Sequence, residues 1–319
     1  MVKNNTIGGV SMKKSRIRHG MLTALLCLFI GGFPQWLIAQ DRLPEYPLLQ
    51  QPAKGCDSLP YRSLRVDTVQ IPEYTLPSAF RHLASNELLD SLGMLYPFWE
   101  KLQLSYVEGT ADTLHIVHVG DSHIRGHIFP HTAGVQLQKT FGSLSYTDIG
   151  INGAFCFSFC RPERIARIVS LHPDLLILSF GTNESHNRRY NAQVHYRQMD
   201  ELVRLLRQKL PDVPILLTTP PGSYESFRSR RHRRTYQVNP RTYQAVQTIR
   251  KYADDNGLAV WDMFEVFGGV QRATLNWWES GLMRPDRVHY LPAGYELQGC
   301  MFHQALLRAY NNYVIQQTS

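Results

Sequence analysis

The sequence predicts an α/β protein, a three-layer α/β/α sandwich with about five parallel strands. Two observations carry this prediction. From residue 113 onward, short and nearly continuous apolar runs alternate with longer amphipathic segments. Strands that are buried on both faces form such apolar runs, and amphipathic helices that cover both faces of a parallel sheet bury them.

Each element follows from its pattern. The predicted strands are LHIVHVG (114–120), LSYTDIG (144–150), DLLILSFG (174–181), VPILLTTP (213–220) and LAVWDMF (258–264). The predicted helices are ERIARIVSLH (163–172), NAQVHYRQMDELVRLLRQKL (191–210), RTYQAVQTIRKYADDNG (241–257) and PAGYELQGCMFHQALLRAYNNYV (292–314). In such sheets ligands bind beyond the carboxyl ends of the strands, so the residues after each apolar run are the expected place for a site.

Residues 1–40 have the pattern of a secretory signal peptide. Basic residues precede the apolar run MLTALLCLFIGGF (21–33), and cleavage is expected near Ala39 or Gln40. This run of 13 residues is shorter than the roughly 20 that span a bilayer. We therefore expect an exported protein, periplasmic or secreted, with no stable membrane insertion after cleavage.

The net charge argues against a nucleic-acid partner once residues 1–40 are removed. The whole chain has a net charge of +8, but five of its basic residues and none of its acidic ones lie in that segment. The remaining chain has 29 basic and 26 acidic residues, a net charge of +3. A general attraction to a polyanion such as nucleic acid is therefore not predicted.

Residues 41–110 form a proline-rich extension ahead of the domain expected at residues 111–319. Within it, leucine spacing in residues 81–105 predicts one or two helices broken around Pro97. Four cysteines follow residue 40: Cys56, Cys156, Cys160 and Cys300. Export permits disulfides, but four cysteines allow three complete pairings, and the sequence does not choose among them. No CxxC is present, so we expect no structural zinc site.

Ser122 follows the first predicted strand in GDSH (120–123). By itself it is more typical of a helix cap than of a nucleophile, because a nucleophilic serine needs a base to accept its proton. RPDRVHYLPAGY (284–295) offers such a base, because Asp286 and His289 stand three residues apart in a segment rich in turn residues. That spacing can place a carboxylate against the imidazole, although a turn begun by Asp286 is the simpler interpretation.

Acyl transfer also needs donors for the developing oxyanion. Gly153 in GINGA (150–154) can offer a backbone N–H, and Asn183 in GTNE (181–184) can offer a side-chain amide. Each has an ordinary alternative, since Gly153 can serve a turn and Asn183 a helix cap. Their occurrence together, each after a predicted strand, favours a site.

The four blocks GDSH, GINGA, GTNE and DRVH resemble those of the SGNH (GDSL-type) hydrolase superfamily, and the resemblance covers about residues 113–310. The first three blocks are similar to those of the bacterial peptidoglycan O-acetylesterases and of the carbohydrate acetylesterases. The resemblance implies a flavodoxin-like SGNH fold with Ser122 as nucleophile, His289 as general base and Asp286 as its partner. It implies an oxyanion hole made by the backbone N–H groups of Ser122 and Gly153 and by the amide of Asn183. Asp121 would support the turn. No metal or cofactor is implied.

Three histidines spaced four residues apart are a further candidate for a metal site. His123, His127 and His131 are spaced four apart and would share one face of a helix. Pro130 would disturb that helix, and no carboxylate or cysteine completes the ligand set, so we expect no metal there. His123 is then expected to be a bystander or a substrate contact.

The segment after the fourth predicted strand is strongly basic. It carries Arg228, Arg230, Arg231, Arg233 and Arg234, interleaved with Tyr224, Phe227 and Tyr236. A solvated loop is one interpretation. The other is that Arg230, Arg231 and Arg233 bind carboxylate or phosphate groups of a polyanionic substrate while the aromatic rings stack on sugars.

The combined hypothesis is an exported serine esterase that removes acetyl groups from a polysaccharide, peptidoglycan among the candidates. Two alternatives remain open from the sequence: an O-acetyltransferase of envelope glycans that uses the same triad, and a non-catalytic glycan-binding module. The sequence does not predict the natural polymer, the acetylated position or the oligomeric state.

Overall fold

The computed structural model describes residues 68–109, 113–228 and 234–317. The predicted signal peptide and its cleavage site lie outside these ranges, as do residues 41–67 of the proline-rich extension, which include Cys56. Arg230, Arg231 and Arg233 also lie outside them.

A six-stranded sheet with the order β1-β8-β5-β4-β2-β3 forms the centre of the fold. Its five parallel strands are β2 (Leu114–Gly120), β3 (Leu144–Gly150), β4 (Leu175–Ser179), β5 (Ile215–Thr218) and β8 (Ala259–Trp261). The two-residue strand β1 (Leu88–Leu89) adds to the β8 edge in the antiparallel sense. The five predicted strands and their parallel arrangement are confirmed.

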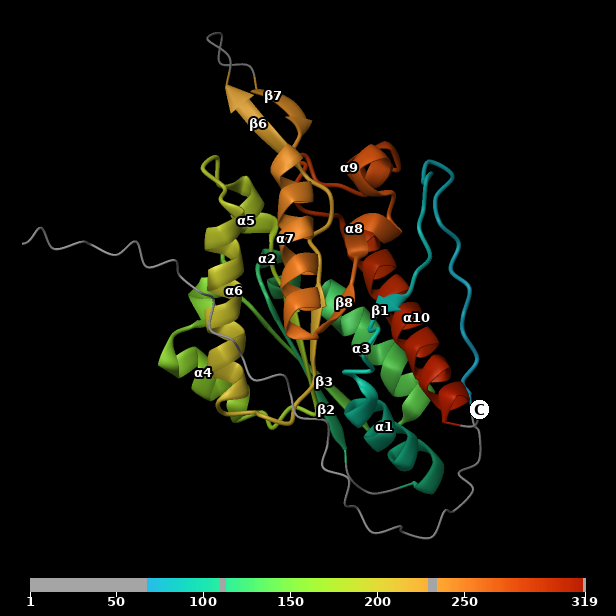
Figure 1. Ribbon diagram of the computed structural model, residues 1–319. Helices are drawn as coiled ribbons and strands as arrows, with labels where there is room; N and C mark the ends of the chain where they lie inside the picture. Colours follow the sequence, from blue (N-terminus) through green and yellow to red (C-terminus); the bar gives the residue numbers. More distant parts are fainter. Residues whose placement is uncertain (1–67, 110–112, 229–233, 318–319) are drawn as a thin grey trace, which may run out of the picture. The chain divides into compact units, whose positions relative to one another are not determined.

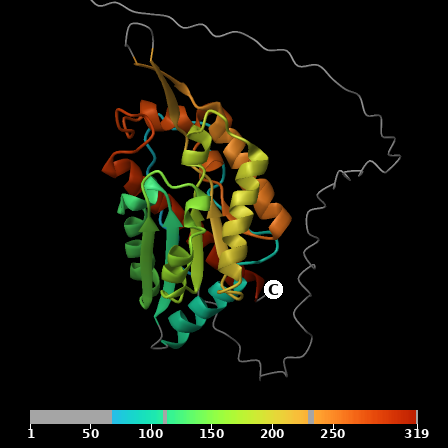
Figure 2. The same cartoon turned by 90° about the vertical axis from the view of Figure 1, so that its left-hand side faces the viewer.

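Helices cover both faces of the sheet, as Figures 1 and 2 show. One layer contains α1 (Tyr96–Glu108), α3 (Ile128–Phe141) and α10 (Pro292–Gln316), and the other contains α4 (Pro162–Val169), α6 (Ala192–Arg207) and α7 (Pro240–Asn256). Alternate residues of one strand serve the two layers: Ile116 packs with the first and Val117 with the second. The predicted three-layer sandwich is thus confirmed.

Short elements at the carboxyl ends of the strands complete the fold. They are α2 (Ser122–Arg125), the 3₁₀ helix η1 (Cys156–Phe159), α5 (Thr182–His186), α8 (Met263–Val266) and α9 (Gly269–Glu279). Within the described ranges, no helix combines the length and the apolar character that crossing a membrane requires.

The helices expected in residues 81–105 are only partly correct. Residues 81–95 contain no helix, and the helical part is α1, which starts at Tyr96. Pro97 lies in the first turn of α1, where a missing N–H costs no helical hydrogen bond, so this proline begins a helix instead of breaking one. The segment before α1 packs on the domain: Val69 and Phe80 are buried in the core shared with α10.

The basic segment is a β-hairpin at its base, formed by β6 (Tyr224–Arg228) and β7 (Arg234–Val238). Arg228 pairs with Arg234 at the end of the described ladder. The hairpin extends from the end of the domain at which α5 and α9 lie (Figure 1).

Candidate active site

Ser122 begins α2 directly after β2, which lies between β4 and β3 in the sheet. Asp121 caps that helix, since its Oδ1 accepts the N–H of His123 at 2.9 Å. Two glycines let α2 lie against the strand ends. A Cβ at Gly120 would come within 2.4 Å of the Ile124 side chain, and one at Gly150 within 2.0 Å of the Arg125 backbone nitrogen. The strand ends therefore fix where the serine hydroxyl lies.

Three predicted residues form one hydrogen-bonded chain. The Oγ of Ser122 lies 2.9 Å from Nε2 of His289, and Nδ1 of His289 lies 3.0 Å from Oδ2 of Asp286. A carboxylate at Nδ1 holds that proton in place, so Nε2 is free to accept the proton of the serine. The structure thus brings together the serine, imidazole and carboxylate that the sequence places 167 residues apart.

Asp286 is fixed by its own turn. Its Oδ1 accepts the backbone N–H groups of Val288 and His289, both at 2.9 Å, so Oδ2 remains for the imidazole. Burial alone would raise the pKa of Asp286, but these two hydrogen bonds and the His289 ring outweigh it and hold the pKa below its usual value. The partner of His289 is therefore ionised at neutral pH.

Arg287 ties this turn to the hairpin. Its backbone has φ +58°, and its guanidinium stacks 3.9 Å from the ring centroid of Trp278, 4.2 Å from that of Tyr236 and 5.2 Å from that of Tyr224. The backbone N–H of Tyr224 also donates to the Arg287 carbonyl at 2.9 Å. The base of the arginine-rich hairpin is thus attached to the segment that carries His289.

The expected oxyanion donors come from three neighbouring strand ends. Gly153 has φ +73°, and its missing Cβ would meet no atom within 4 Å, so the backbone conformation is what favours glycine. The amide of Asn183 donates to the Ala154 carbonyl at 2.9 Å and to Oδ2 of Asp121 at 3.3 Å. The longer bond is the weaker one, so that hydrogen is the more readily available to an anion.

Asp121 carries a perturbed carboxyl group. It is 2% exposed, and burial raises its pKa from 3.8 to about 7. The residue next to the nucleophile can therefore change its protonation state near neutral pH, beyond the supporting role expected from the sequence.

His123 is enclosed beside the triad. The residue is 5% exposed, its Nδ1 lies 3.0 Å from the hydroxyl of Tyr295, and its ring packs 5.4 Å from that of His289. Burial lowers the pKa of His123 to about 3, so the ring is neutral. Whether His123 is a bystander or a substrate contact stays a prediction. The sequence offered no signal for its contact with Tyr295.

The three histidines considered for a metal do not share a helix face. Helix α2 ends at Arg125, and α3 begins at Ile128, with His127 between them at φ +65°. Pro130 lies in the first turn of α3, where proline is tolerated. His127 is instead paired with Asp148 at 2.5 Å.

His186 is a site residue that the sequence analysis missed. It lies three positions after Asn183 on α5, on the same side of that helix, and its Nε2 is 3.1 Å from Oγ of Ser223. Burial lowers its pKa, and the charges of His289 and Asp286 act on it from nearby. The i, i+3 spacing to Asn183 is the signal that could have identified it.

Comparison with known proteins agrees with this geometry. The sequence profile of the GDSL-like lipase/acylhydrolase family matches residues 105–297. No curated protein matches the chain.

Among solved structures, one described as a peptidoglycan O-acetylesterase in action is 18% identical, with a TM-score of 0.62, and the match covers 70% of this chain and 99% of that one. A GDSL-like lipase from Bacteroides thetaiotaomicron is 18% identical over 67% of this chain and 99% of that one, with a TM-score of 0.45. The GDSL-like lipase from Parabacteroides merdae is 17% identical over 61% and 97%, with a TM-score of 0.47.

Proposed function

Because the chain belongs to the GDSL-like lipase/acylhydrolase family and is a carboxylic ester hydrolase, we propose that it removes small acyl groups, acetyl above all, from a polysaccharide through an acyl-enzyme on Ser122. The observation that carries the proposal is the hydrogen-bonded chain from Ser122 through His289 to Asp286.

In the proposed first step, the Oγ of Ser122 attacks the acetyl carbonyl while Nε2 of His289, 2.9 Å away, takes its proton. The imidazolium that forms is stabilised by the ionised Asp286 at Nδ1. His289 then gives the proton to the sugar oxygen as the ester bond breaks. Water, activated by the same imidazole, attacks the acetyl-serine and releases acetate.

The oxyanion of each tetrahedral intermediate is assigned to three donors: the backbone N–H groups of Ser122 and Gly153 and the amide of Asn183. In the free protein that amide is shared between Ala154 and Asp121, at 2.9 Å and 3.3 Å. We assign the hydrogen on Asp121 to the oxyanion, while the bond to Ala154 keeps the amide in position.

The proposed substrate is an acetylated, anionic glycan, and peptidoglycan is the first polymer to test. The neighbour with a TM-score of 0.62 is described as a peptidoglycan O-acetylesterase. The hairpin that carries the basic segment is attached to the segment of His289 through Arg287, which favours contact between its arginines and the polymer chain. We further propose export, on the pattern of residues 1–40.

The test is an acetate-release assay on O-acetylated peptidoglycan, xylan and pectin, with the Ser122→Ala protein as the blank. We expect release from at least one polymer with the wild type and none above background with Ser122→Ala. Undiminished release by Ser122→Ala contradicts the assignment of the nucleophile.

The same assay separates the proposed hydrolase from its alternatives. An acetylated acceptor sugar in place of free acetate identifies an acetyltransferase. A Ser122 that does not react with a fluorophosphonate probe, in a protein that still binds glycan, identifies a binding module.

A further inference from the structure

A second cluster of reactive side chains lies close to Asn183, one of the expected oxyanion donors. Cys156, Glu184 and His195 each place one ligand atom so that all three atoms lie within 4.8 Å of one another. All three residues are buried, with exposures of 1%, 4% and 2%. They come from η1, α5 and α6, and none of them takes part in the chemistry proposed for Ser122.

The free nitrogen of His195 has a defined protonation state. The Thr248 hydroxyl donates to the Gln244 carbonyl at 2.9 Å. The Tyr190 hydroxyl donates to the same carbonyl at 3.3 Å and lies 2.8 Å from the Thr248 oxygen. The Tyr190 oxygen, with its hydrogen already used, accepts from Nδ1–H of His195 at 3.0 Å. Nε2 therefore carries a lone pair, and it has no hydrogen-bond partner among the described residues.

The Glu184 carboxylate and the Cys156 thiol also lack a cation partner among the described residues. The Glu184 carboxylate accepts the backbone N–H groups of Cys156 at 2.7 Å and Gly181 at 2.9 Å, and it makes no ion pair within the described part of the chain. The Cys156 thiol is free. Burial, followed by the nearby Glu184 charge, raises its pKa well above the usual value. The Cys156 thiol is hydrogen-bonded to the Glu184 carboxylate, and the free Nε2 of His195 faces this pair with no cation beside it among the described residues.

We propose that Cys156, Glu184 and His195 bind one zinc ion. A thiolate, an imidazole and a carboxylate are a donor set that Zn²⁺ prefers, and three protein ligands leave a fourth tetrahedral position for water. On binding, the Cys156 S–H bond breaks, its proton goes to solvent and a Zn–S bond forms. The two charges of Zn²⁺ then balance the thiolate and the carboxylate, so the buried site has no net charge.

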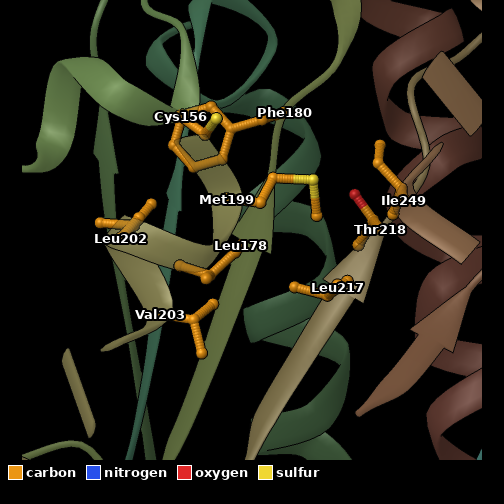
Figure 3. A pocket seen from close by; sticks show the side chains of 9 residues that line it. All are labelled: Cys156, Leu178, Phe180, Met199, Leu202, Val203, Leu217, Thr218 and Ile249. Carbon is orange, nitrogen blue, oxygen red and sulfur yellow. The ribbon is translucent and has the colours of Figure 1, made fainter. Parts of the chain in front are cut away.

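The surroundings suit such a site. The Nδ1–H hydrogen bond of His195 to Tyr190 is the type of outer contact that orients a metal-bound imidazole, and the two N–H bonds hold the carboxylate. Around Cys156 the neighbours are apolar; Figure 3 shows its sulfur beside Phe180 and near Met199. The expectation of no structural zinc rested on CxxC spacing, whereas these ligands span 40 residues and meet only in the folded chain.

The position gives the zinc a bracing role. Cys156 lies two residues after Ala154, whose carbonyl holds the Asn183 amide, and Glu184 is the residue after Asn183. A zinc at this cluster would link the segment that holds the Asn183 amide and the helix that carries Asn183 to α6, without contact to the substrate.

The test uses the reduced full chain. We expect about one zinc per chain to remain after equilibration with excess Zn²⁺ and gel filtration, and we expect Co²⁺ to give a thiolate-to-cobalt charge-transfer band. Cys156→Ser and His195→Phe should lose stoichiometric zinc, and Cys156→Ser should also lose the band. The matched control is Cys160→Ser, which removes a free thiol four residues away and should keep both.

Wild-type protein without bound zinc, or a cobalt spectrum without the thiolate band, overturns the proposal. A band that survives in Cys156→Ser also overturns it, because the site would then lie elsewhere. If circular dichroism shows that a variant does not fold, the zinc content and the cobalt spectrum of the wild-type protein alone test the proposal.

Discussion

The two sides of the triad are built in different ways. Ser122 stands between the buried residues Asp121 and His123, on a helix that follows directly after β2. Asp286 and His289 lie in an irregular segment with side-chain exposures of 43% and 32%. The core thus positions the nucleophile, whereas a local turn and an arginine clamp position the base. Substitutions on the two sides should therefore change different properties.

The largest effect is expected from Asp286→Asn, on the exposed side. An amide at this position no longer fixes the Nδ1–H tautomer or stabilises the imidazolium, which costs triads about 10⁴-fold in kcat. The measurement is kcat for a small neutral ester, with thermal unfolding as the check on folding. A loss of less than about tenfold would show that His289 is oriented without its carboxylate.

On the buried side, Asp121→Asn should change stability more than catalysis. The folded pKa of Asp121 is about 7, against 3.8 for the ordinary group, so the folded protein keeps a proton that the unfolded chain loses. The proton on Asp121 therefore contributes fully to the free energy of unfolding below pH 3.8, and this contribution is lost as the pH rises to about 7. The full loss is about 4 kcal/mol.

Urea unfolding of the wild type between pH 4 and pH 8 measures this loss, and the Asp121→Asn protein should lack it. An identical pH dependence in the two proteins would show that Asp121 ionises normally despite its burial.

A smaller effect is expected from Arg287→Ala, which removes the clamp on the base. Loss of the stacking on Trp278 and Tyr236 should lower kcat about tenfold, the equivalent of about 1.4 kcal/mol. Arg284→Ala is the matched control, since Arg284 is exposed in the same segment. Arg287→Gly separates the causes, because glycine accepts φ +58° but cannot stack. Full activity of Arg287→Gly would contradict the clamp.

The smallest effect is expected from the three arginines of the basic segment that were predicted to bind substrate. Replacing Arg230, Arg231 and Arg233 by Ser should raise KM for an anionic acetylated polymer about fivefold, because exposed charge contacts are worth about 0.2–1 kcal/mol each. KM for a small neutral ester should stay unchanged. Equal changes for both substrates, or none for either, would rule out a role in polymer binding.

The parts of the fold that the sequence predicted are those with a strong local signal. Buried parallel strands are nearly continuous apolar runs, so all five were visible, and the carboxyl-end rule then pointed to Ser122, Gly153 and Asn183. The spacing of Asp286 and His289 was enough for their contact because one turn makes it.

The features that were missed depend on contacts between distant residues. The partner of His123 is Tyr295, 172 residues away, and only the packed core brings the two together. Pro97 was interpreted as a break because proline disfavours helix interiors, yet the same ring is tolerated in a first turn. The cluster of Cys156, Glu184 and His195 has no periodic pattern, since its ligands come from three separate elements.

The turn at Asp286 has a consequence for how the enzyme becomes reactive. Asp286, Val288 and His289 are bonded within four residues, so base and carboxylate can pair before the rest of the chain has folded. The bond from His289 to Ser122 spans 167 residues and forms only when the C-terminal segment docks. We therefore expect a chain that has not finished folding to carry a serine without its base, which does not attack esters. Labelling of Ser122 by a fluorophosphonate would then report the docking step.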